Sequence, residues 1–227
     1  MLTEAQREQL VQGAESWGLS LEAEVVAKFE RFAELLEAGN QRLNLTRIPM
    51  EEIVTLHFLD SLALAAVLSP PPGARLLDLG TGGGFPGLPL ALAFPKLQVT
   101  LVDSTQKRLT FLEEVLADLG LSGSVRTVHG RAEDLARLPL HREVYHIVTA
   151  RAVAKMDVLA PWMLPFVRPG GIAVAYKSRE ATLEIEAARP KIGNSGGILE
   201  RVEDIPLPGT DIHRKLAILK KTHRGRL

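Results

Sequence analysis

The first 68 residues of the chain show the spacing of amphipathic helices. Apolar residues recur at helical intervals between Val25 and Leu36, and charged residues fill the remaining faces. The pattern predicts a helix that ends near Gly39 and a second helix over about residues 50–68. The prolines that begin at Pro70 would stop the second helix.

From Arg75 onward the pattern changes to short apolar runs separated by helix-like stretches. The runs are Arg75–Leu79, Val99–Val102, Val125–His129, His146–Ala150, Ile172–Tyr176 and Leu216–Leu219, and the helix-like stretches are Pro89–Phe94, Lys107–Leu119 and Val153–Phe166. Such alternation predicts an α/β fold: a mostly parallel, doubly wound sheet with helices on both faces and ligands at the carboxyl ends of its strands. We therefore expect an N-terminal helical extension over residues 1–72 and a ligand-binding domain over residues 73–227.

Composition narrows the class of protein and its chemistry. The 227 residues are 46% hydrophobic and 24% charged, which suits one compact domain with a small extension. The chain has no cysteine, and this excludes disulfides, thiolate metal sites and cysteine nucleophiles. Acids follow Met1 where a signal peptide carries bases, and no apolar run reaches the roughly 20 residues of a membrane helix. We expect a cytoplasmic protein.

The net charge of zero hides an uneven distribution. Residues 1–72 hold 5 Lys/Arg against 11 Asp/Glu, whereas residues 177–227 hold 11 against 7. From Arg214 to the C-terminus there are six bases and no acid. Such a basic tail can neutralise RNA phosphates or can be a solvated terminus, and the sequence leaves both interpretations open.

The loop after the first predicted strand carries the glycines of a nucleotide-like site. Five glycines between Gly80 and Gly87 let the chain turn sharply into a helix and let a ligand approach the backbone. The segment Gly82–Gly87 also fits the GxGxxG pattern of dinucleotide-binding enzymes. A nicotinamide-dependent oxidoreductase is therefore one alternative.

Acidic residues follow three successive predicted strands. Asp78 ends the first strand, where it suits the ammonium of a methionine moiety better than a pyrophosphate. Asp103 ends the second strand and can accept hydrogen bonds from ribose hydroxyls, and Glu133 follows the third, where it can hold an adenine amino group. Each acid alone could instead cap a helix or lie in solvent. Together they favour an S-adenosylmethionine-dependent methyltransferase, because that cofactor has no phosphates.

The atom that is methylated can be narrowed by exclusion. Covalent methylation of a pyrimidine carbon needs a cysteine, which is absent. Methylation of exocyclic amines usually employs Asn or Asp followed by Pro-Pro-aromatic after the fourth strand, whereas this chain has Thr149-Ala-Arg-Ala152. The N7 atom of guanine has an in-plane lone pair and no proton to remove, so orientation alone can suffice. The sequence is consistent with N7 methylation.

Motifs along nearly the whole chain point to one family. They are Asn44-Leu-Thr46, His57-Phe-Leu-Asp60-Ser61, Leu77 to Pro89 with Gly-Phe-Pro-Gly-Leu-Pro inside it, Val102-Asp103, Gly130 to Glu133 and Ala150 to Val153. The chain thereby resembles the RsmG family, also called glucose-inhibited division protein B, the 16S ribosomal RNA (guanine-527, N7) methyltransferases. The resemblance implies a Rossmann-like class I methyltransferase with an antiparallel last strand, S-adenosylmethionine as cofactor and small-subunit ribosomal RNA as partner. A non-catalytic ribosome-assembly module that binds RNA is the other alternative, and we expect a monomer.

The resemblance also implies roles for individual residues. Gly80, Gly82 and Phe85 would contact the cofactor from the loop, Asp103, Ser104 and Thr105 would hold its ribose side, and Ala132 and Glu133 would meet its adenine. Arg151 would face the cofactor beside the guanine pocket in a catalytic position; its alternative is an ion pair with Asp78 or Asp157.

His57, Asp60 and Ser61 have the i, i+3, i+4 spacing of one helical face. The resemblance puts this face at the mouth of the active site, which makes His57 and Asp60 candidate catalytic residues. The same face could instead seat the helix on the glycine loop, and both roles can hold together.

Three further residues are candidate RNA contacts: Asn44, Lys177 and Arg214. Asn44 could equally cap a turn. The chain departs from the family where Ser178 follows Lys177 in place of glycine, and where His213 precedes Arg214 instead of following an arginine. Aromatic residues that could stack on a flipped base are Phe85, Tyr176 and Trp162, although core positions are the alternative for all three and the favoured one for Trp162.

Overall fold

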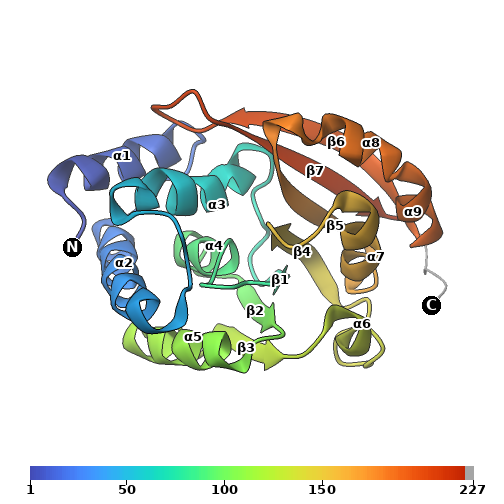
Figure 1. Cartoon of the computed structure of the whole chain (residues 1–227), viewed down its shortest axis with the longest axis horizontal. Coiled ribbons are helices and arrows are strands. Elements are labelled where there is room, and N and C mark those ends of the chain that lie inside the picture. The colour runs from blue at the N-terminus through green and yellow to red at the C-terminus, as the bar shows by residue number, and fades with distance from the viewer. Residues whose placement is uncertain (223–227) are drawn as a thin grey trace.

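A computed structural model gives the structure of residues 1–222, and it contains one seven-stranded sheet (Figure 1). The strands are β1 (Arg75–Leu79), β2 (Gln98–Asp103), β3 (Val125–His129), β4 (Tyr145–Arg151), β5 (Val167–Ser178), β6 (Gly197–Pro206) and β7 (His213–Lys221). Their spatial order is β3-β2-β1-β4-β5-β7-β6. The first five strands are parallel, and β7 is antiparallel to both β5 and β6. The predicted doubly wound α/β fold with an antiparallel last strand is confirmed.

The order of the strands fixes where a ligand should bind. From β1 the chain moves outward to β2 and β3, and then crosses back to β4 on the other side of β1. The carboxyl ends of β1 and β4 therefore flank the point at which the winding reverses, and ligands of open parallel sheets bind in the crevice at such a point.

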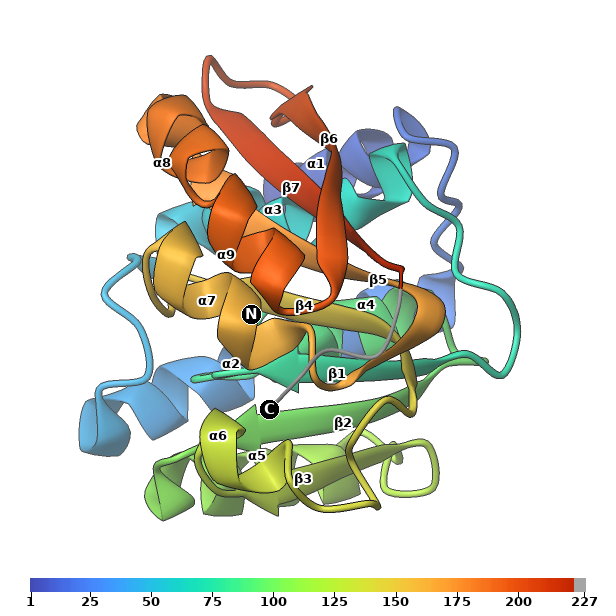
Figure 2. The same ribbon diagram turned by 90° about the vertical axis from the view of Figure 1, so that its right-hand side faces the viewer.

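Two layers of helices cover the sheet (Figures 1 and 2). One layer holds α4 (Gly87–Ala93) and α5 (Gln106–Asp118), and the other holds α6 (Ala132–Leu135), α7 (Met156–Met163), α8 (Thr182–Ala187) and α9 (Arg189–Asn194). Apolar strand residues alternate between the two layers: Leu76 packs with the first layer and Leu77 with the second. No helix among residues 1–222 is long and apolar enough to cross a membrane.

The N-terminal segment is helical but less regular than the sequence predicts. It contains α1 (Glu4–Glu15), α2 (Ala23–Leu43), the 3-10 turn η1 (Met50–Glu52), the π-helix η2 (Val54–Leu59), α3 (Asp60–Leu62) and the 3-10 turn η3 (Ala63–Ala66). The helix expected over residues 50–68 is thus a succession of short turns. Helix α2 continues past Gly39 to Leu43. The glycine lets α2 pack closely on the ring of Phe111, since an added Cβ would lie only 2.5 Å from that ring.

An aromatic cluster joins the N-terminal helices to the glycine loop. The ring of Phe58 lies 5.0 Å from that of Phe29 and 5.9 Å from that of Phe32, and Phe32 lies 5.3 Å from Phe85 of the loop. These residues belong to one buried cluster that also includes Leu88 of α4. The N-terminal helices and one face of the sheet therefore share a core, and the division of the chain at residue 72 stays a prediction.

A shared core predicts that the two parts unfold together. The two tryptophans provide separate reporters, since Trp17 packs with the N-terminal helices and Trp162 lies in α7. Trp162→Phe and Trp17→Phe variants should give the same urea midpoint by fluorescence. Phe58→Ala, introduced into each variant, should lower the free energy of unfolding by about 3 kcal/mol. Both urea midpoints should fall by the same amount. An earlier transition at Trp17 alone would contradict a shared core.

Candidate functional site

Asp78 at the end of β1 shapes the glycine loop from below. Its side chain is fully buried, and Oδ2 accepts hydrogen bonds from Thr81 Oγ1 at 2.7 Å and from the Gly87 amide at 2.9 Å, while Oδ1 accepts from Thr149 Oγ1 at 2.9 Å. Burial raises the pKa of Asp78 to about 6, against these donors and the charge of Arg151. The structure shows Asp78 bound to the chain itself and outside the lining of either pocket described below, and its contact with the ammonium of a ligand stays a prediction.

The first cavity at the carboxyl edge of the sheet is the strand-end pocket, of about 220 Å³. It is lined by Gly80, Asp103, Ser104, Ala132, Glu133 and Trp162, with Leu79, Val102 and Val153 among its apolar walls. The structure therefore brings five of the predicted cofactor residues together. Trp162, which the sequence favours as a core residue, packs against the core and also forms part of the wall.

Three other predicted cofactor residues lie outside the lining of this pocket. Gly82 and Thr105 donate their amides to the Asp103 carboxylate at 3.0 and 2.8 Å. Phe85 is 5% exposed and packs in the aromatic cluster. Gly82 and Thr105 thus orient Asp103, since each donates its amide to one oxygen of that carboxylate. Each oxygen keeps a lone pair that can accept a hydrogen bond from a ligand.

The second cavity, the arginine pocket, has a volume of about 510 Å³. Its lining includes His57, Asp60, Arg151, Lys177, Glu184 and Arg214. These residues come from the π-helix η2, α3, β4, β5, α8 and β7, so the pocket gathers side chains from across the sequence. All three residues proposed as catalytic and two of the three proposed to contact RNA lie in it.

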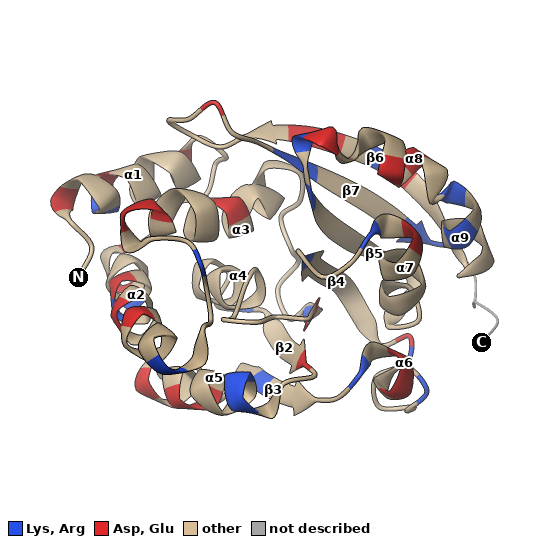
Figure 3. Cartoon of the chain, viewed as in Figure 1, with Lys and Arg blue, Asp and Glu red and all other residues tan. Residues whose placement is uncertain are grey.

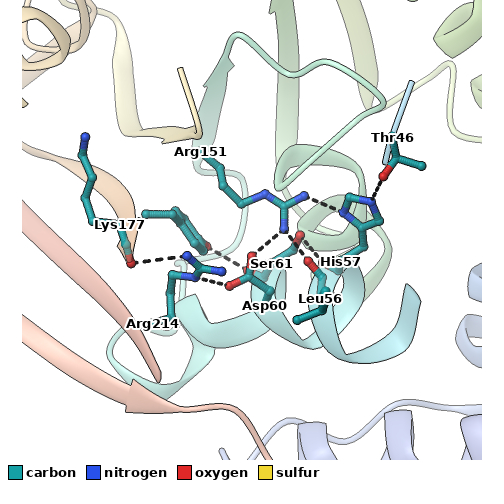
Figure 4. Close-up of polar contacts among 9 residues, drawn as sticks. Thr46, Leu56, His57, Asp60, Ser61, Arg151, Lys177 and Arg214 are labelled. Carbon is teal, nitrogen blue, oxygen red and sulfur yellow. Dashed lines mark hydrogen bonds and ion pairs between the residues drawn. The ribbon is translucent and has the colours of Figure 1, made fainter. Parts of the chain in front are cut away.

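Arg151 at the end of β4 is the centre of this pocket (Figure 4). Its Nη1 donates to Asp60 Oδ2 at 2.6 Å and to the Leu56 carbonyl at 3.2 Å, and its Nη2 donates to His57 Nδ1 at 2.9 Å. The guanidinium also lies over the Phe85 ring, 5.1 Å from its centre. The sequence offered Asp78 or Asp157 as its ion-pair partner; the structure corrects this to Asp60.

Asp60 carries two ion pairs although it is only 1% exposed. One oxygen accepts from Arg151 and the other from Arg214 Nε. Arg214 also donates to the Lys177 carbonyl at 3.4 Å. The group of two guanidiniums and one carboxylate keeps one net positive charge at the mouth of the sheet.

His57 is fixed in one neutral tautomer. Because an arginine can only donate, Nδ1 must be the acceptor from Arg151, and Nε2–H then donates to Thr46 Oγ1 at 2.6 Å. Burial, with the charge of Arg151, lowers the pKa of His57 to about 3. The ring stacks on Phe85 at 4.0 Å with an angle of 7° between the planes. His57 therefore both lines the pocket and seats its helix on the glycine loop.

The remaining candidates occupy different positions. Lys177 is largely buried, and its Nζ donates to the Ala154 carbonyl at 2.6 Å and to Glu184 at 2.7 Å. Asn44 is exposed and ends α2 in a left-handed conformation, with φ of 49°. Tyr176 is buried and donates to the Ser61 carbonyl at 2.8 Å. Of the basic tail, Arg224 and Arg226 lie outside the described residues.

The turn after β4 supplies residues to both pockets. Arg151 lines the arginine pocket and Val153 lines the strand-end pocket. Between them, Ala152 adopts a left-handed conformation, with φ of 57°. At Gly80, with φ of 69°, a Cβ would lie 2.7 Å from Val153, so the turn packs directly on the glycine loop.

Comparison with known proteins identifies the family. A family model described as "GidB: rRNA small subunit methyltransferase G" matches residues 25–209. The chain belongs to this family. It is 43% identical over 215 residues to ribosomal RNA small subunit methyltransferase G of Thermoanaerobacter sp. (strain X514), covering 94% of this chain and 89% of that protein. The protein of the same name from Roseiflexus castenholzii is 44% identical over 214 residues, covering 94% and 91%.

Solved structures share the fold of this member of the GidB family. TrmN from Thermus thermophilus superposes with a TM-score of 0.55 at 22% identity, over 74% of this chain and 53% of that one. Geranyl diphosphate C-methyltransferase from Streptomyces coelicolor, solved with S-adenosyl-L-homocysteine, gives a TM-score of 0.54 at 11% identity, over 72% and 78%. The fold is that of the class I methyltransferases.

The neutral state of His57 predicts a specific acid sensitivity. The folded-state pKa of His57, about 3, lies below the unfolded value of about 6.5. The contribution of neutral His57 to the free energy of unfolding is therefore complete above pH 6.5 and is lost as the pH falls toward 3. Between pH 7 and pH 5 it should cost about 2 kcal/mol of unfolding free energy. Urea unfolding should show a smaller acid loss in His57→Gln, whereas the exposed His129→Gln should keep the wild-type loss. Equal losses in all three would contradict the neutral assignment.

Proposed function

We propose that this chain transfers the methyl group of S-adenosylmethionine to the N7 atom of a guanine in small-subunit ribosomal RNA, in the cytoplasm. The observation that carries the proposal is that one short turn, Arg151–Val153, contributes residues to both pockets in a chain of the GidB family. One pocket has the residues for the methyl donor, and the other has the basic residues for an RNA substrate.

The strand-end pocket fits the donor by its chemistry. Asp103 offers a carboxylate to ribose hydroxyls, Glu133 offers one to the adenine amino group, and Trp162 gives an apolar wall for a planar ring. When bound, S-adenosylmethionine supplies an electrophilic methyl group on a sulfonium sulfur. Gly80 has no room for a side chain, because its conformation is left-handed and a Cβ would lie 2.7 Å from Val153, so the loop packs closely on the turn at the edge of this pocket.

The same observations oppose a dinucleotide. At Gly87, the third glycine of the GxGxxG pattern, the amide that begins α4 donates to the buried carboxylate of Asp78. A pyrophosphate at this helix start would therefore face an anion instead of free amides. The nicotinamide-dependent oxidoreductase is not favoured.

The arginine pocket suits an acceptor atom that needs no deprotonation. His57 is neutral with Nδ1 engaged by Arg151, and both oxygens of Asp60 are engaged by arginines. Neither is available as a general base. With the donor bound, the methyl group would pass to the N7 lone pair and the electrons of the carbon–sulfur bond would stay on sulfur, so no proton would have to leave the guanine. The chain then contributes by holding the two reactants in line.

The distribution of charge supports an RNA site near the arginine pocket. Acidic residues are frequent on α1 and α2, and several Lys and Arg lie along β7 and on α9, although basic residues also lie on α5 and acidic ones on α8 (Figure 3). RNA phosphates should be attracted to the side of the arginine pocket, where Arg151 and Arg214 lie. That the chain acts as a monomer stays a prediction.

Transfer of tritium-labelled methyl groups tests the activity. Label should pass from S-adenosylmethionine to small-subunit ribosomal RNA, as the naked RNA, an assembly intermediate or the finished subunit, and should map to the N7 atom of one guanine. Unrelated RNA should remain unlabelled. Label on another base would overturn the N7 assignment. Binding of ribosomal RNA without any transfer would favour the non-catalytic assembly module.

Calorimetry tests the donor pocket. S-adenosylhomocysteine should bind to the wild-type chain, and Asp103→Asn should weaken it about tenfold or more, because a charged acceptor for the ribose hydroxyls is lost. Glu114→Gln, an exposed change on the neighbouring α5, should leave the affinity unchanged. Binding of NADH without binding of S-adenosylhomocysteine would refute the proposed cofactor.

A further inference from the structure

The arginine pocket contains a second carboxylate, Glu184 of α8, which the sequence analysis did not single out. It differs from Asp60 because one of its carboxylate oxygens accepts no hydrogen bond from residues 1–222. Both oxygens of Asp60 are bound by arginines and the residue is 1% exposed. The side chain of Glu184 is 32% exposed, and its hydrogen bonds within residues 1–222 all end on Oε1. Oε2 is the free acceptor.

Two donors anchor Glu184 beside the turn that supplies residues to both pockets. Oε1 accepts from the Met156 amide and from Lys177 Nζ, both at 2.7 Å, and Lys177 also donates to the Ala154 carbonyl at 2.6 Å. Burial alone would raise the pKa of Glu184, but these donors and the charge of Lys155 outweigh burial and hold the pKa below its usual range. Glu184 is therefore a carboxylate at neutral pH, fixed against the segment that follows Ala152.

Guanine presents a distinctive pattern to such a pocket. Its N1–H and N2 amino group are adjacent donors on one edge, and its O6 acceptor lies between that edge and N7. The arginine pocket offers cationic donors at Arg151 and Arg214 and a fixed carboxylate at Glu184. Adenine has an amino group in place of O6 and an unprotonated N1, so it would set donor against donor and acceptor against acceptor.

We infer that Glu184 recognises the target guanine by accepting hydrogen bonds from its N1–H and N2 amino group. This inference rests on the proposed function and names the residue that selects the base. It also gives Glu184 a part in the rate. Attack by N7 leaves a positive charge on the ring, so the hydrogen bonds to the carboxylate strengthen as the methyl group transfers, while the N1 proton stays on the base.

Glu184→Gln separates recognition from structure. The amide oxygen can keep the bonds to Met156 and Lys177, while the amino group replaces the Oε2 acceptor with a donor. Transfer should be measured on ribosomal RNA carrying either the target guanine or inosine, which lacks the N2 amino group. In the variant, kcat/KM on guanine should fall about 10- to 100-fold, with much of the loss in kcat, and the preference for guanine over inosine should shrink toward unity.

Two controls accompany the measurement. Glu186→Gln removes the same charge from an exposed position of α8 that pairs with Arg189, and should leave both the rate and the base preference at wild-type values. The Kd of Glu184→Gln for ribosomal RNA by filter retention should change less than threefold, because phosphate contacts dominate binding.

Three results would overturn the inference. The first is an unchanged preference for guanine over inosine in Glu184→Gln. The second needs no variant: a wild-type chain that methylates inosine as fast as guanine does not read the N2 amino group. Both leave the proposed function standing, since transfer to guanine occurs. In the third, the wild-type chain transfers no methyl group to any ribosomal RNA, and the proposed function fails together with the inference.

Discussion

The buried carboxylate of Asp60 is the interaction on which the arrangement of the site depends. It joins α3 of the N-terminal segment to Arg151 of β4 and to Arg214 of β7, three segments far apart in the sequence. Removing one partner from a buried ion pair leaves an uncompensated charge and costs about 3–5 kcal/mol. The three segments must therefore assemble together, and the N-terminal helices are held over the carboxyl edge of the sheet.

Two other carboxylates, Asp78 and Asp103, fix the shape of the glycine loop beside the strand-end pocket. Asp78 binds the glycine loop from below through Thr81 and Gly87, and Asp103 binds the Gly82 amide from the neighbouring strand. The loop thus has its shape fixed by the chain before a ligand arrives, which lowers the cost of ordering it on binding. Both acids support backbone amides of the loop region, and of the two only Asp103 also lines the pocket.

The sequence predicted those parts of the site that follow from local rules. Parallel strands end at one edge, so Gly80, Asp103 and Glu133 could be placed together from their positions alone. The ion pair of Arg151 could not, because its partner is chosen by how the N-terminal helices lie over β4. Glu184 was missed for a different reason, because it lies on a six-residue helix with no motif of its own.

Among the strands, only β6 was missed. It is an edge strand with a register shift between Leu199 and Arg201, and Ile198 is 52% exposed, so polar and apolar positions do not alternate cleanly. His57 and Asp60 do lie on one side of their helical segment, since both side chains bond to Arg151, while their catalytic role stays a prediction. The regular helix that the prediction assumed is replaced by a π-helix and short turns, a variation that spacing alone does not reveal.

In the proposed function, the turn after β4 would hold the donor and the acceptor close together. Consecutive Cα atoms are about 3.8 Å apart, so Arg151 and Val153 can be separated by at most about 7 Å, yet they line different pockets. The left-handed conformation of Ala152 makes this possible, at a cost of about 1 kcal/mol for a residue that has a Cβ. Methyl transfer needs the reacting atoms roughly 3 Å apart, and a wider connection would separate them. Under the proposed function, the strain at Ala152 therefore lies in the turn that would set the distance between the two reactants.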